Sequence, residues 1–291
     1  YWTGPGEIVD EWLEGDDSEI VMNRALAFIR RHAKRKTPFL SLIWFHAPHT
    51  PIVAGDDDRA KYKDQPVEAQ HWYGCLRALD RQVGRLRKSL RRMGIADNTI
   101  VWYCSDNGPS YIHNYNSAGP FRGKKAELLE GGVRVPAILE WPGKLTKPRV
   151  VDTPVCTNDF YPTILNALGI RMPNQPVLDG IDVMPIVQGK TKRRPVPIAF
   201  QAPIKRKSSS GAKQGSKQLA LHDNQYKTYS VDDGRTYALY DLVADPGETK
   251  DLAADKPEIV AKMKAHLDEW VASCEASLAG KDYVTQSKER K

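Results

Sequence analysis

An apolar run that ends in a polar turn occupies residues 99–108, which read Thr99-Ile100-Val101-Trp102-Tyr103-Cys104-Ser105-Asp106-Asn107-Gly108. A continuously apolar run of this kind predicts a strand that is buried on both faces, as in parallel sheets. Residues 39–45 form a second such run, and a loop rich in histidine and proline follows it at 46–51. Amphipathic helical patterns over 16–36 and 68–93 precede the two runs. This alternation predicts an α/β fold with a mainly parallel sheet flanked by helices.

The second half of the chain has the pattern of a smaller α+β region. Short strand patterns separated by turns predict an antiparallel sheet, and an apolar face over 257–273 predicts a closing helix. The strand patterns lie at 218–221, 226–230 and 237–242. We expect four segments, which are an α/β domain over 1–190, a basic flexible linker or loop over 191–217, an antiparallel subdomain with its closing helix over 218–275, and a tail over 276–291.

Composition and charge exclude several classes of protein. The 291 residues are 41% hydrophobic and 27% charged, which is ordinary for a globular chain and excludes wholesale disorder. No apolar run approaches the roughly 18–20 residues of a membrane-spanning helix. The net charge of +7 comes from two segments, 77–92 and 190–217, which together contribute +15. No nucleic-acid-reading motif accompanies them, so we expect no nucleic-acid partner.

The polar turn Asp106-Asn107-Gly108 permits two interpretations. Asp and Asn before Gly are typical of a tight turn with positive φ. A carboxylate beside a carboxamide oxygen also suits a hard cation such as Ca²⁺, which binds oxygen ligands. In parallel sheets, ligands bind outside the carboxyl ends of the strands, where both this turn and the 46–51 loop are expected. Two ligands cannot hold a divalent ion, so a metal site would need further carboxylates.

Two histidines and two lysines are further candidates. His46 and His49 lie on a loop that two prolines stiffen, and each is either a structural histidine or an imidazole that contacts an anion or protonates a leaving group. Lys124 and Lys125 lie in a basic, glycine-flanked stretch over 121–136, where a lysine is either solvated or holds a tetrahedral oxyanion. The chain has no G-x-S-x-G elbow, H-E-x-x-H or P-loop. Its four cysteines, which we expect to be buried free thiols, lie outside electropositive loops.

Six segments in a fixed order resemble the sulfatase family, within the alkaline-phosphatase-like superfamily. Each match is weak alone, but six in the family's order and spacing make a strong resemblance. The resemblance implies an incomplete alkaline-phosphatase-like sheet followed by a C-terminal subdomain. The segments are 39–51, similar to the family's apolar strand and histidine-proline loop; 99–108, similar to its strand ending in an Asp-Asn metal pair; 121–136, similar to its Arg-Gly-Lys segment ending in Glu-Gly-Gly-x-Arg-x-Pro; and the signatures at 159–165, 178–182 and 239–248.

The resemblance implies hydrolysis of a sulfuric ester with one bound Ca²⁺. Asp106 and Asn107 would be two of the calcium ligands, and the others would come from the family's N-terminal part, which is missing here. His49 and Lys125 would hold sulfate oxygens and would stabilise or protonate the leaving alkoxide. His46 lies near them, and the family pattern gives it no fixed role. Family members are commonly exported, which implies a periplasmic or extracellular location.

The chain departs from the family pattern in two places. The family lysine usually stands in a Gly-Lys-Gly-Thr-like context, whereas this sequence reads Lys124-Lys125-Ala126-Glu127. Lys125 fits the alignment, and Lys124 is the alternative. The Cys/Ser-x-Pro-x-Arg segment, whose first residue becomes the formylglycine nucleophile, is absent, as are the family's paired N-terminal acidic ligands and its central lysine and histidine. We therefore expect the C-terminal part of a sulfatase, a fragment with half an active site, no nucleophile and no activity alone.

The substrate class is implied only in outline. A sulfatase of this kind is arylsulfatase-like or a carbohydrate sulfatase, so its partner would be a sulfated small molecule or glycan, and the oligomeric state is open. Two alternatives are a phosphate or phosphonate ester hydrolase of the same superfamily and a non-catalytic polyanion-binding module that uses the basic stretch over 190–217.

Overall fold

The computed structural model describes residues 2–8, 15–110, 117–204 and 215–282, which belong to two units. The expected domain boundary at 190 does not coincide with this division, because the chain passes between the units several times before residue 147. Unit 1 takes in residues 1–103, 112–115 and 138–146, and unit 2 takes in residues 104–111, 116–137 and 147–291.

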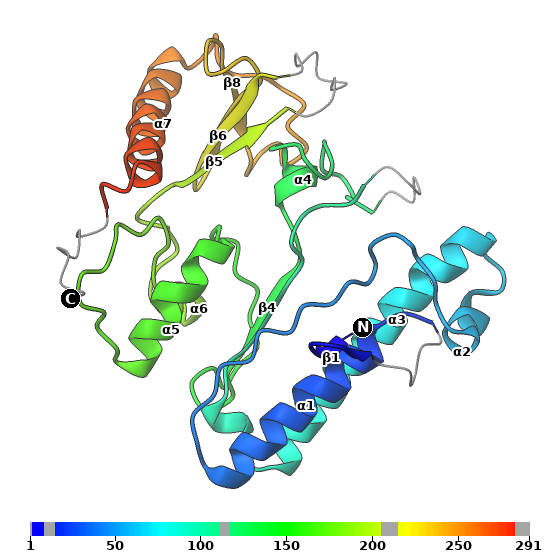
Figure 1. The fold of residues 1–291 in the computed structure, drawn as a ribbon. Coiled ribbons are helices and arrows are strands. Elements are labelled where there is room, and N and C mark those ends of the chain that lie inside the picture. Colours follow the sequence, from blue (N-terminus) through cyan, green and yellow to red (C-terminus); the bar gives the residue numbers. More distant parts are fainter. Residues whose placement is uncertain (1, 9–14, 111–116, 205–214, 283–291) are drawn as a thin grey trace. The chain divides into compact units, whose positions relative to one another are not determined.

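Two long helices form the core of unit 1 (Figure 1). They are α1 (Ser18–Arg35) and α3 (Val67–Arg92), and both follow the predicted helical patterns closely. Apolar residues at spacings of three and four on α1 pack against Leu86 and Leu90 of α3. The amphipathic pattern therefore becomes a helix–helix core, and its residues from α1 are Met22, Leu26 and Ile29.

Short elements complete unit 1. The turn of helix α2 packs against α3, where the buried Asp58 accepts hydrogen bonds from Arg77 Nε at 3.1 Å and from Arg81 Nη2 at 2.8 Å. Strand β3 is the strand predicted at residues 99–104, and it pairs with β4. The bounds of these elements are α2 (Asp56–Arg59), β3 (Val101–Cys104), β4 (Ala137–Glu140) and the antiparallel hairpin of β1 (Trp2–Gly4) and β2 (Glu7–Ile8).

Residues 39–45 do not form the predicted buried strand. Phe39, Ile43 and Phe45 pack against the α1/α3 core, whereas the alternate side chains face solvent. Within the described part of the chain, no backbone hydrogen bond joins this segment to a strand. Strand formation requires a neighbouring backbone as well as an apolar pattern, and none of the described strands supplies one here. The exposed fractions of the outward side chains are 65% for Leu40, 69% for Leu42 and 83% for Trp44.

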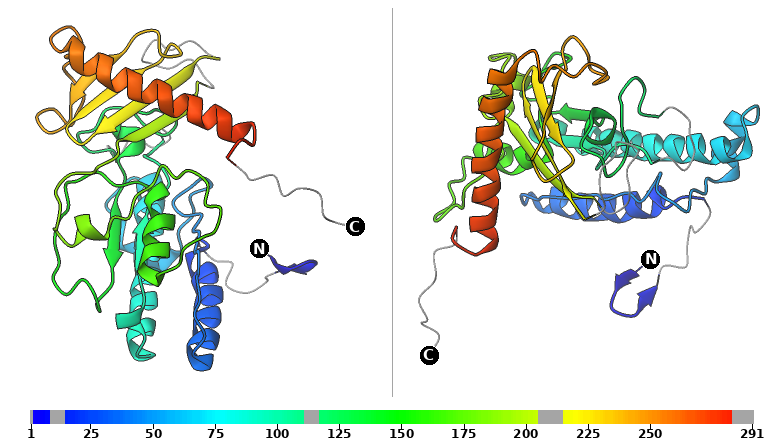
Figure 2. Two further views of the ribbon diagram at one scale, coloured as in Figure 1. Left: turned by 90° about the vertical axis from the view of Figure 1, so that its left-hand side faces the viewer. Right: turned by 90° about the horizontal axis from the view of Figure 1, so that it is seen from above.

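A four-stranded antiparallel sheet is the centre of unit 2 and confirms the expected antiparallel subdomain. Helix α7 (Pro257–Leu278) covers one face of this sheet (Figure 2). Its Met263 and Leu267 pack there on alternate apolar strand residues. The first strand lies inside the predicted linker 191–217, so this part of the linker is a strand, and residues 205–214 lie outside the described residues. The strands, in sheet order, are β5 (Ile198–Pro203), β6 (Lys217–Asp223), β7 (Tyr226–Ser230) and β8 (Ala238–Asp241).

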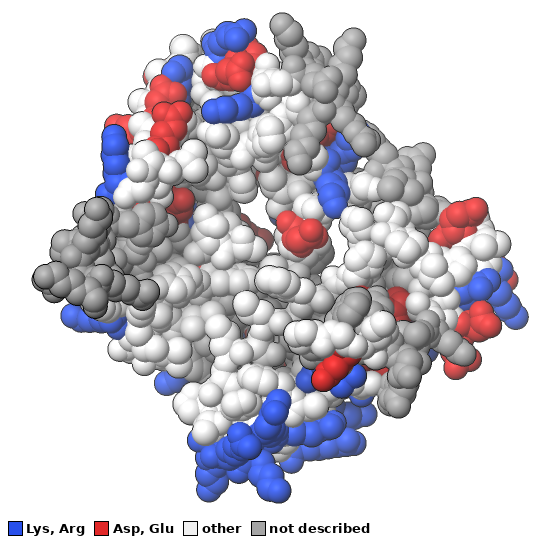
Figure 3. Space-filling view, in the orientation of Figure 1, with Lys and Arg blue, Asp and Glu red and all other residues white. Residues whose placement is uncertain are grey.

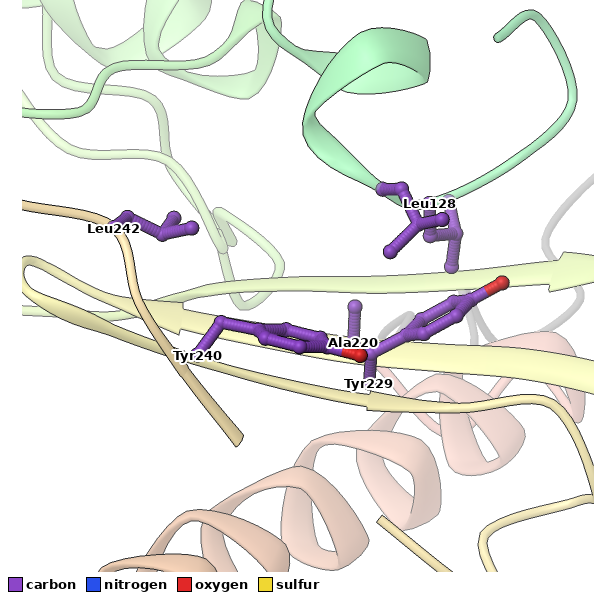
Figure 4. Packing of buried hydrophobic residues seen from close by; sticks show 6 residues of the cluster. Leu128, Ala220, Tyr229, Tyr240 and Leu242 are labelled. Carbon is purple, nitrogen blue, oxygen red and sulfur yellow. The ribbon is translucent and has the colours of Figure 1, made fainter. Parts of the chain in front are cut away.

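The other face of the sheet is covered by the segment that leads into helix α4 (Glu130–Val133). Leu128 of this segment packs against Ala220, Tyr229 and Tyr240 of the strands (Figure 4). Because successive strand side chains point to opposite faces, the residues two positions away from Ala220 and Tyr229 also face the α4 segment. These flanking residues are Gln218, His222 and Lys227.

Two of the family signature segments are held together by the buried carboxylate of Asp159. Arg194 Nη1 and Nη2 lie 2.7 and 2.8 Å from the Asp159 carboxylate oxygens, and both side chains are fully buried. The same carboxylate accepts hydrogen bonds from the backbone N–H groups of Cys156 and Ile181, each at 2.8 Å. The signatures at 159–165 and 178–182 therefore have a structural role in this unit. The first of them includes most of α5 (Phe160–Leu168), and the second lies just before α6 (Met184–Val187).

All four cysteines are free thiols, as expected, but only Cys75 is buried and the other three are half-buried. Across the described ranges, no helix combines the length and the apolar character needed to cross a membrane.

Candidate functional site

The Asp-Asn turn lies at the carboxyl end of β3, in unit 2. Ser105 N donates to Pro136 O at 3.2 Å, which fixes the chain as it leaves the strand. The Asp106 side chain is exposed, and Asn107 is half-buried. Asn107 Nδ2 donates to Gly108 O at 2.9 Å, so Oδ1 is the side-chain atom left to accept a hydrogen bond or to coordinate a cation. The turn thus offers one carboxylate and one oriented carboxamide oxygen.

Gly108 seats this turn on the Gly131-Gly132 pair. Its N–H donates to Gly132 O at 2.9 Å, and a Cβ at this position would overlap Gly131 O. Only glycine allows the two backbone segments to approach this closely. The Asp-Asn-Gly and Glu-Gly-Gly motifs are therefore one packed structure, although 22 residues separate Gly108 from Glu130 in the sequence.

The lysine loop is attached to the same structure by backbone hydrogen bonds. Lys125 N donates to Pro109 O at 2.8 Å, and Gly131 N donates to Arg122 O at 2.7 Å. Lys124 and Lys125 are both half-buried, and the next residue, Ala126, has a φ of 73°. The structure thus brings together the loops that carry Asp106, Asn107, Lys124 and Lys125.

Polar side chains of the β5–β8 sheet form hydrogen bonds with these loops. Gln218 Oε1 accepts from Leu128 N at 3.1 Å, and its Nε2 donates to Ala126 O at 2.8 Å. The Nζ atom of the fully buried Lys227 lies 2.9 Å from Glu130 Oε1 and 3.0 Å from Glu248 Oε1. Neither Gln218 nor Lys227 is singled out by its sequence context. The period-two strand pattern places both on the inner face, but it does not say which partner each one has.

Glu248 completes this buried charge cluster. Its Oε2 accepts from Glu130 N at 2.7 Å, so one carboxylate contacts both the ammonium of Lys227 and the first backbone N–H of α4. Burial raises the pKa of Glu248, against the opposing effect of Lys227. The signature at 239–248 therefore reaches the Glu-Gly-Gly motif through a buried side chain.

His46 and His49 lie in unit 1. His49 N donates to His46 O at 2.8 Å, and the two ring centroids are 5.2 Å apart. His49 Nδ1 lies 2.9 Å from Thr50 O; because a carbonyl can only accept, Nδ1 carries the proton and Nε2 is left for a further partner. Both rings are exposed and line a pocket of about 320 Å³. The structure joins the two histidines to each other, within their own unit.

None of the four thiols has the character of an activated nucleophile. Burial raises the pKa of Cys75 to about 12 and that of Cys156 to about 11. The pKa of Cys104 is raised by burial and by the negative charge of Asp106, and burial also raises the pKa of Cys274. Thiols of this kind are protonated at neutral pH and react slowly.

The oxygen set of the Asp-Asn turn fits a hard cation, but it does not complete a site. A carboxylate and a carboxamide oxygen at a strand end are ligands that Ca²⁺ accepts. No group of three or more His, Cys, Asp and Glu side chains that could hold a metal ion is present among the residues described. Any ion at Asp106 and Asn107 would therefore need ligands from elsewhere.

Comparison with known proteins identifies the family. The sequence model of the sulfatase family matches residues 2–170, and that of the N-sulphoglucosamine sulphohydrolase C-terminal region matches residues 124–273. A sulfatase of Formosa agariphila is 32% identical over 275 residues, which cover 84% of this chain and 48% of that protein. The steryl-sulfatase of Rattus norvegicus is 34% identical over 174 residues, which cover 56% of this chain and 28% of that protein. The chain thus spans about half the length, or less, of these relatives.

Solved structures show the same relationship. The structure of Ps i-CgsB in complex with k-i-k-neocarrahexaose matches with a TM-score of 0.79 at 25% identity, and the match covers 88% of this chain and 55% of that one. A phosphonate monoester hydrolase of Agrobacterium radiobacter shares the fold at a TM-score of 0.59 and 18% identity, over 90% of this chain and 62% of that one. The alkaline-phosphatase-like fold expected from the sequence is thereby confirmed. On these matches, the chain belongs to the sulfatase family.

Proposed function

We propose that this chain supplies part of the active site of a sulfuric ester hydrolase that acts on sulfated carbohydrates. The observation that carries the proposal is the 2.8 Å hydrogen bond from Lys125 N to Pro109 O, which joins the lysine loop to the Asp106-Asn107 turn. A lysine that could bind an anion and a carboxylate and a carboxamide that could bind a cation thereby lie in one packed structure, in a chain of the sulfatase family.

Lys125 is our choice for the lysine that holds a sulfate oxygen. The family places a glycine after its lysine, and here Ala126 has a φ of 73°, in the left-handed region that glycine favours. This backbone conformation supports the register in which Lys125 is the family lysine and Lys124 is its neighbour. An ammonium group at this position would stabilise negative charge that develops on the sulfate and on the leaving oxygen.

Asp106 and Asn107 would hold a Ca²⁺ ion together with ligands from outside the described residues. When bound, the ion would polarise the sulfate group. The contribution of this chain would be to present the Asp106 carboxylate and to orient Asn107 Oδ1, because the hydrogen bond from Nδ2 to Gly108 O fixes the carboxamide plane.

His49 is the proposed proton donor, and His46 is its neighbour. The hydrogen bond between His49 Nδ1 and Thr50 O fixes the ring, so Nε2 is the nitrogen that would contact a sulfate oxygen or protonate the leaving alkoxide. This role requires the imidazolium form, because only then does Nε2 carry a proton.

A sulfated carbohydrate is the substrate class favoured by the relatives and by charge. Relatives include N-acetylgalactosamine-6-sulfatases, and structural neighbours include complexes with k-i-k-neocarrahexaose and D-glucosamine-2-N,6-O-disulfate. Unit 1 also has a basic end, where exposed Lys and Arg side chains gather at the C-terminal ends of α1 and α3 (Figure 3). Such a surface attracts a polyanion. The basic end consists of Arg30, Arg31, Lys34, Arg35, Lys36, Lys88, Arg91 and Arg92.

Turnover assays with Ca²⁺ test the proposal. We expect the 291-residue chain to be inactive on aryl and sugar sulfates. We expect a longer form of the protein, one that also contains a Cys/Ser-x-Pro-x-Arg segment, to be active. In that longer form, Lys125→Ala should lower kcat/KM by about 10²- to 10³-fold, and Lys124→Ala by far less. The reverse ranking would show that the lysine register is wrong. Turnover by the 291-residue chain alone, lost in Asp106→Ala, would contradict the expectation that a nucleophile is missing.

The alternative reaction is tested with the same protein. A phosphonate monoester hydrolase shares the fold, and its match is weaker than that of the sulfatases. Faster hydrolysis of a phosphonate monoester than of any sulfate ester would favour that alternative. We also propose a periplasmic or extracellular location, on the family resemblance alone.

A further inference from the structure

We infer that the β5–β8 sheet positions the candidate site through two buried side chains, Gln218 and Lys227. The inference rests on the proposed function, because it concerns the loops assigned there to sulfate and cation binding. It assigns a task to the C-terminal sheet, which contributes no candidate site residue of its own.

The two side chains lie on the face of the sheet that carries the α4 segment. Gln218 is on β6 and Lys227 on β7, and each lies two positions from a residue of the apolar cluster that packs against Leu128, so it shares that residue's face. Gln218 is 3% exposed and Lys227 is fully buried. Ala220 and Tyr229 provide apolar contacts in this layer (Figure 4). Gln218 and Lys227 add specific hydrogen bonds to the chain segment over 126–130.

Gln218 holds the backbone immediately after Lys125. Its carboxamide spans Ala126 O at 2.8 Å and Leu128 N at 3.1 Å, and Tyr229 Oη donates to its Oε1 at 2.9 Å. The Ala126 backbone is in the left-handed region, which costs free energy for a residue other than glycine and persists only when the surroundings fix it. Gln218 is such a constraint, so it determines the direction in which the chain presents Lys125.

Lys227 holds the other loop, through Glu130. The ammonium lies 2.9 Å from Glu130 Oε1, and Glu248 accepts from Glu130 N at 2.7 Å. Glu130 thus has both its side chain and its N–H fixed, and the next two residues are the glycines on which Gly108 is seated. A shift of Glu130 would therefore move the support of the Asp106-Asn107 turn.

A buried ion cluster is a poor source of stability alone, since apolar residues of similar volume often stabilise a fold equally well. A cluster that fixes one backbone segment can instead provide geometry. The two residues should then have separable effects, with Gln218 acting on the Lys125 loop and Lys227 acting on the Asp106-Asn107 turn.

Amide hydrogen exchange of the 291-residue chain, measured by NMR, tests this separation without substrate. In Gln218→Leu, we expect the exchange of the Lys125 and Leu128 amides to accelerate about tenfold or more. In Lys227→Met, we expect the same acceleration at Gly108, Gly131 and Gly132. Amides of α7 should keep their wild-type exchange in both variants. Lys264→Met, which breaks the exposed 2.5 Å pair with Asp268 on α7, is the matched control and should change neither loop.

Lys227→Met leaves the buried Glu248 carboxylate without an ion partner and Glu130 with only the exposed Arg134 at 3.8 Å, so a second variant guards against unfolding of the unit. The triple change Glu130→Gln, Lys227→Met and Glu248→Gln removes every charge of the cluster. We expect it to fold with wild-type exchange in α7 but with fast exchange at Gly108 and Gly132. Wild-type protection of those two amides in the triple variant would overturn the role of Lys227, and wild-type protection of Lys125 in Gln218→Leu would overturn that of Gln218.

A catalytically active product of the gene would give a second readout. Lys227→Met should raise the Ca²⁺ concentration needed for half-maximal rate, whereas Gln218→Leu should lower kcat and leave that concentration unchanged. The opposite assignment would overturn the inference. Absence of sulfatase activity would count against the proposed function only, because the exchange experiment does not depend on turnover.

Discussion

Two sets of charged side chains, one in each unit, are used in opposite ways. In unit 2, Arg194 and Lys227 are fully buried, and each contacts a carboxylate at 2.7–3.0 Å. In unit 1, the basic end of α1 and α3 is exposed, and among the described residues only Arg91 of that end has a carboxylate partner, Glu140 at 3.3 Å. The buried charges connect segments that are distant in sequence, whereas the exposed ones remain available to solvent and to other molecules.

This difference shows that the net charge of a unit does not determine what its individual charged side chains do. A buried charge must be compensated at fixed geometry, because desolvation without a partner costs several kcal/mol, so it specifies which segments meet. An exposed charge is screened over about 8–10 Å at physiological salt and specifies little about the fold. Changes to the buried charges should therefore act on stability, and changes to the exposed ones on binding.

The largest effect is expected from Arg194→Met. It leaves the Asp159 carboxylate buried without its ion partner, which costs about 3–5 kcal/mol in the free energy of unfolding of unit 2. Urea-induced unfolding followed by circular dichroism measures the change. Arg235→Met, which breaks the exposed 3.4 Å pair with Asp233, should cost less than about 1 kcal/mol. Equal losses in the two variants would remove the contrast drawn here.

Gly108→Ala should have the next largest effect. The new methyl group would overlap Gly131 O, so the turn must move, and such overpacking typically costs about 1–3 kcal/mol. Gly84→Ala in α3 of unit 1 is the control, because no atom lies within 4 Å of the added Cβ. There the change should stabilise the helix by about 0.5–1 kcal/mol. Thermal unfolding of both variants tests the opposite signs.

The pH dependence of unit 2 should report on His222. Burial lowers the pKa of this imidazole, and the charges of Lys227 and Arg134 lower it further, against the opposing effect of Glu130. Below about pH 6.5, the unfolded state therefore binds a proton that the folded state takes up only at lower pH, and stability falls as the pH falls. We expect urea unfolding to show this loss between neutral pH and the folded-state pKa, and His222→Gln to reduce it. An unchanged pH slope in the variant would contradict the assignment.

The smallest effect on stability is expected at the basic end. Lys34→Gln removes one exposed cation that lies four residues from Arg30, so it should change stability by less than about 0.5 kcal/mol. Replacing Arg31, Lys34 and Lys88 together by Gln should instead lower the salt concentration that elutes the chain from a heparin column. Unchanged retention, with the fold intact, would show that this end does not bind polyanions.

Helices α1 and α3 and three of the four strands of the antiparallel sheet, all but β5, could be predicted from the sequence because their signals are local. A stripe such as Met22, Leu26 and Ile29 repeats with the helical period, so neighbouring residues in the sequence are enough to predict the helix. The Asp106-Asn107 turn and the lysine loop were also accessible, since short motifs carry their own chemistry. The structure adds that backbone hydrogen bonds at Gly108 and Lys125 join them.

Tertiary structure alone decided the rest. The run over 39–45 has a strand's apolar pattern, yet strand formation needs a second backbone, and no described strand pairs with it. The strand pattern put Gln218 and Lys227 on an inner face, but only the fold determines that Ala126, Leu128 and Glu130 meet them there. The physical reason is that periodicity is a property of neighbouring residues, whereas the partner of a buried polar group is found across about 90 residues of chain.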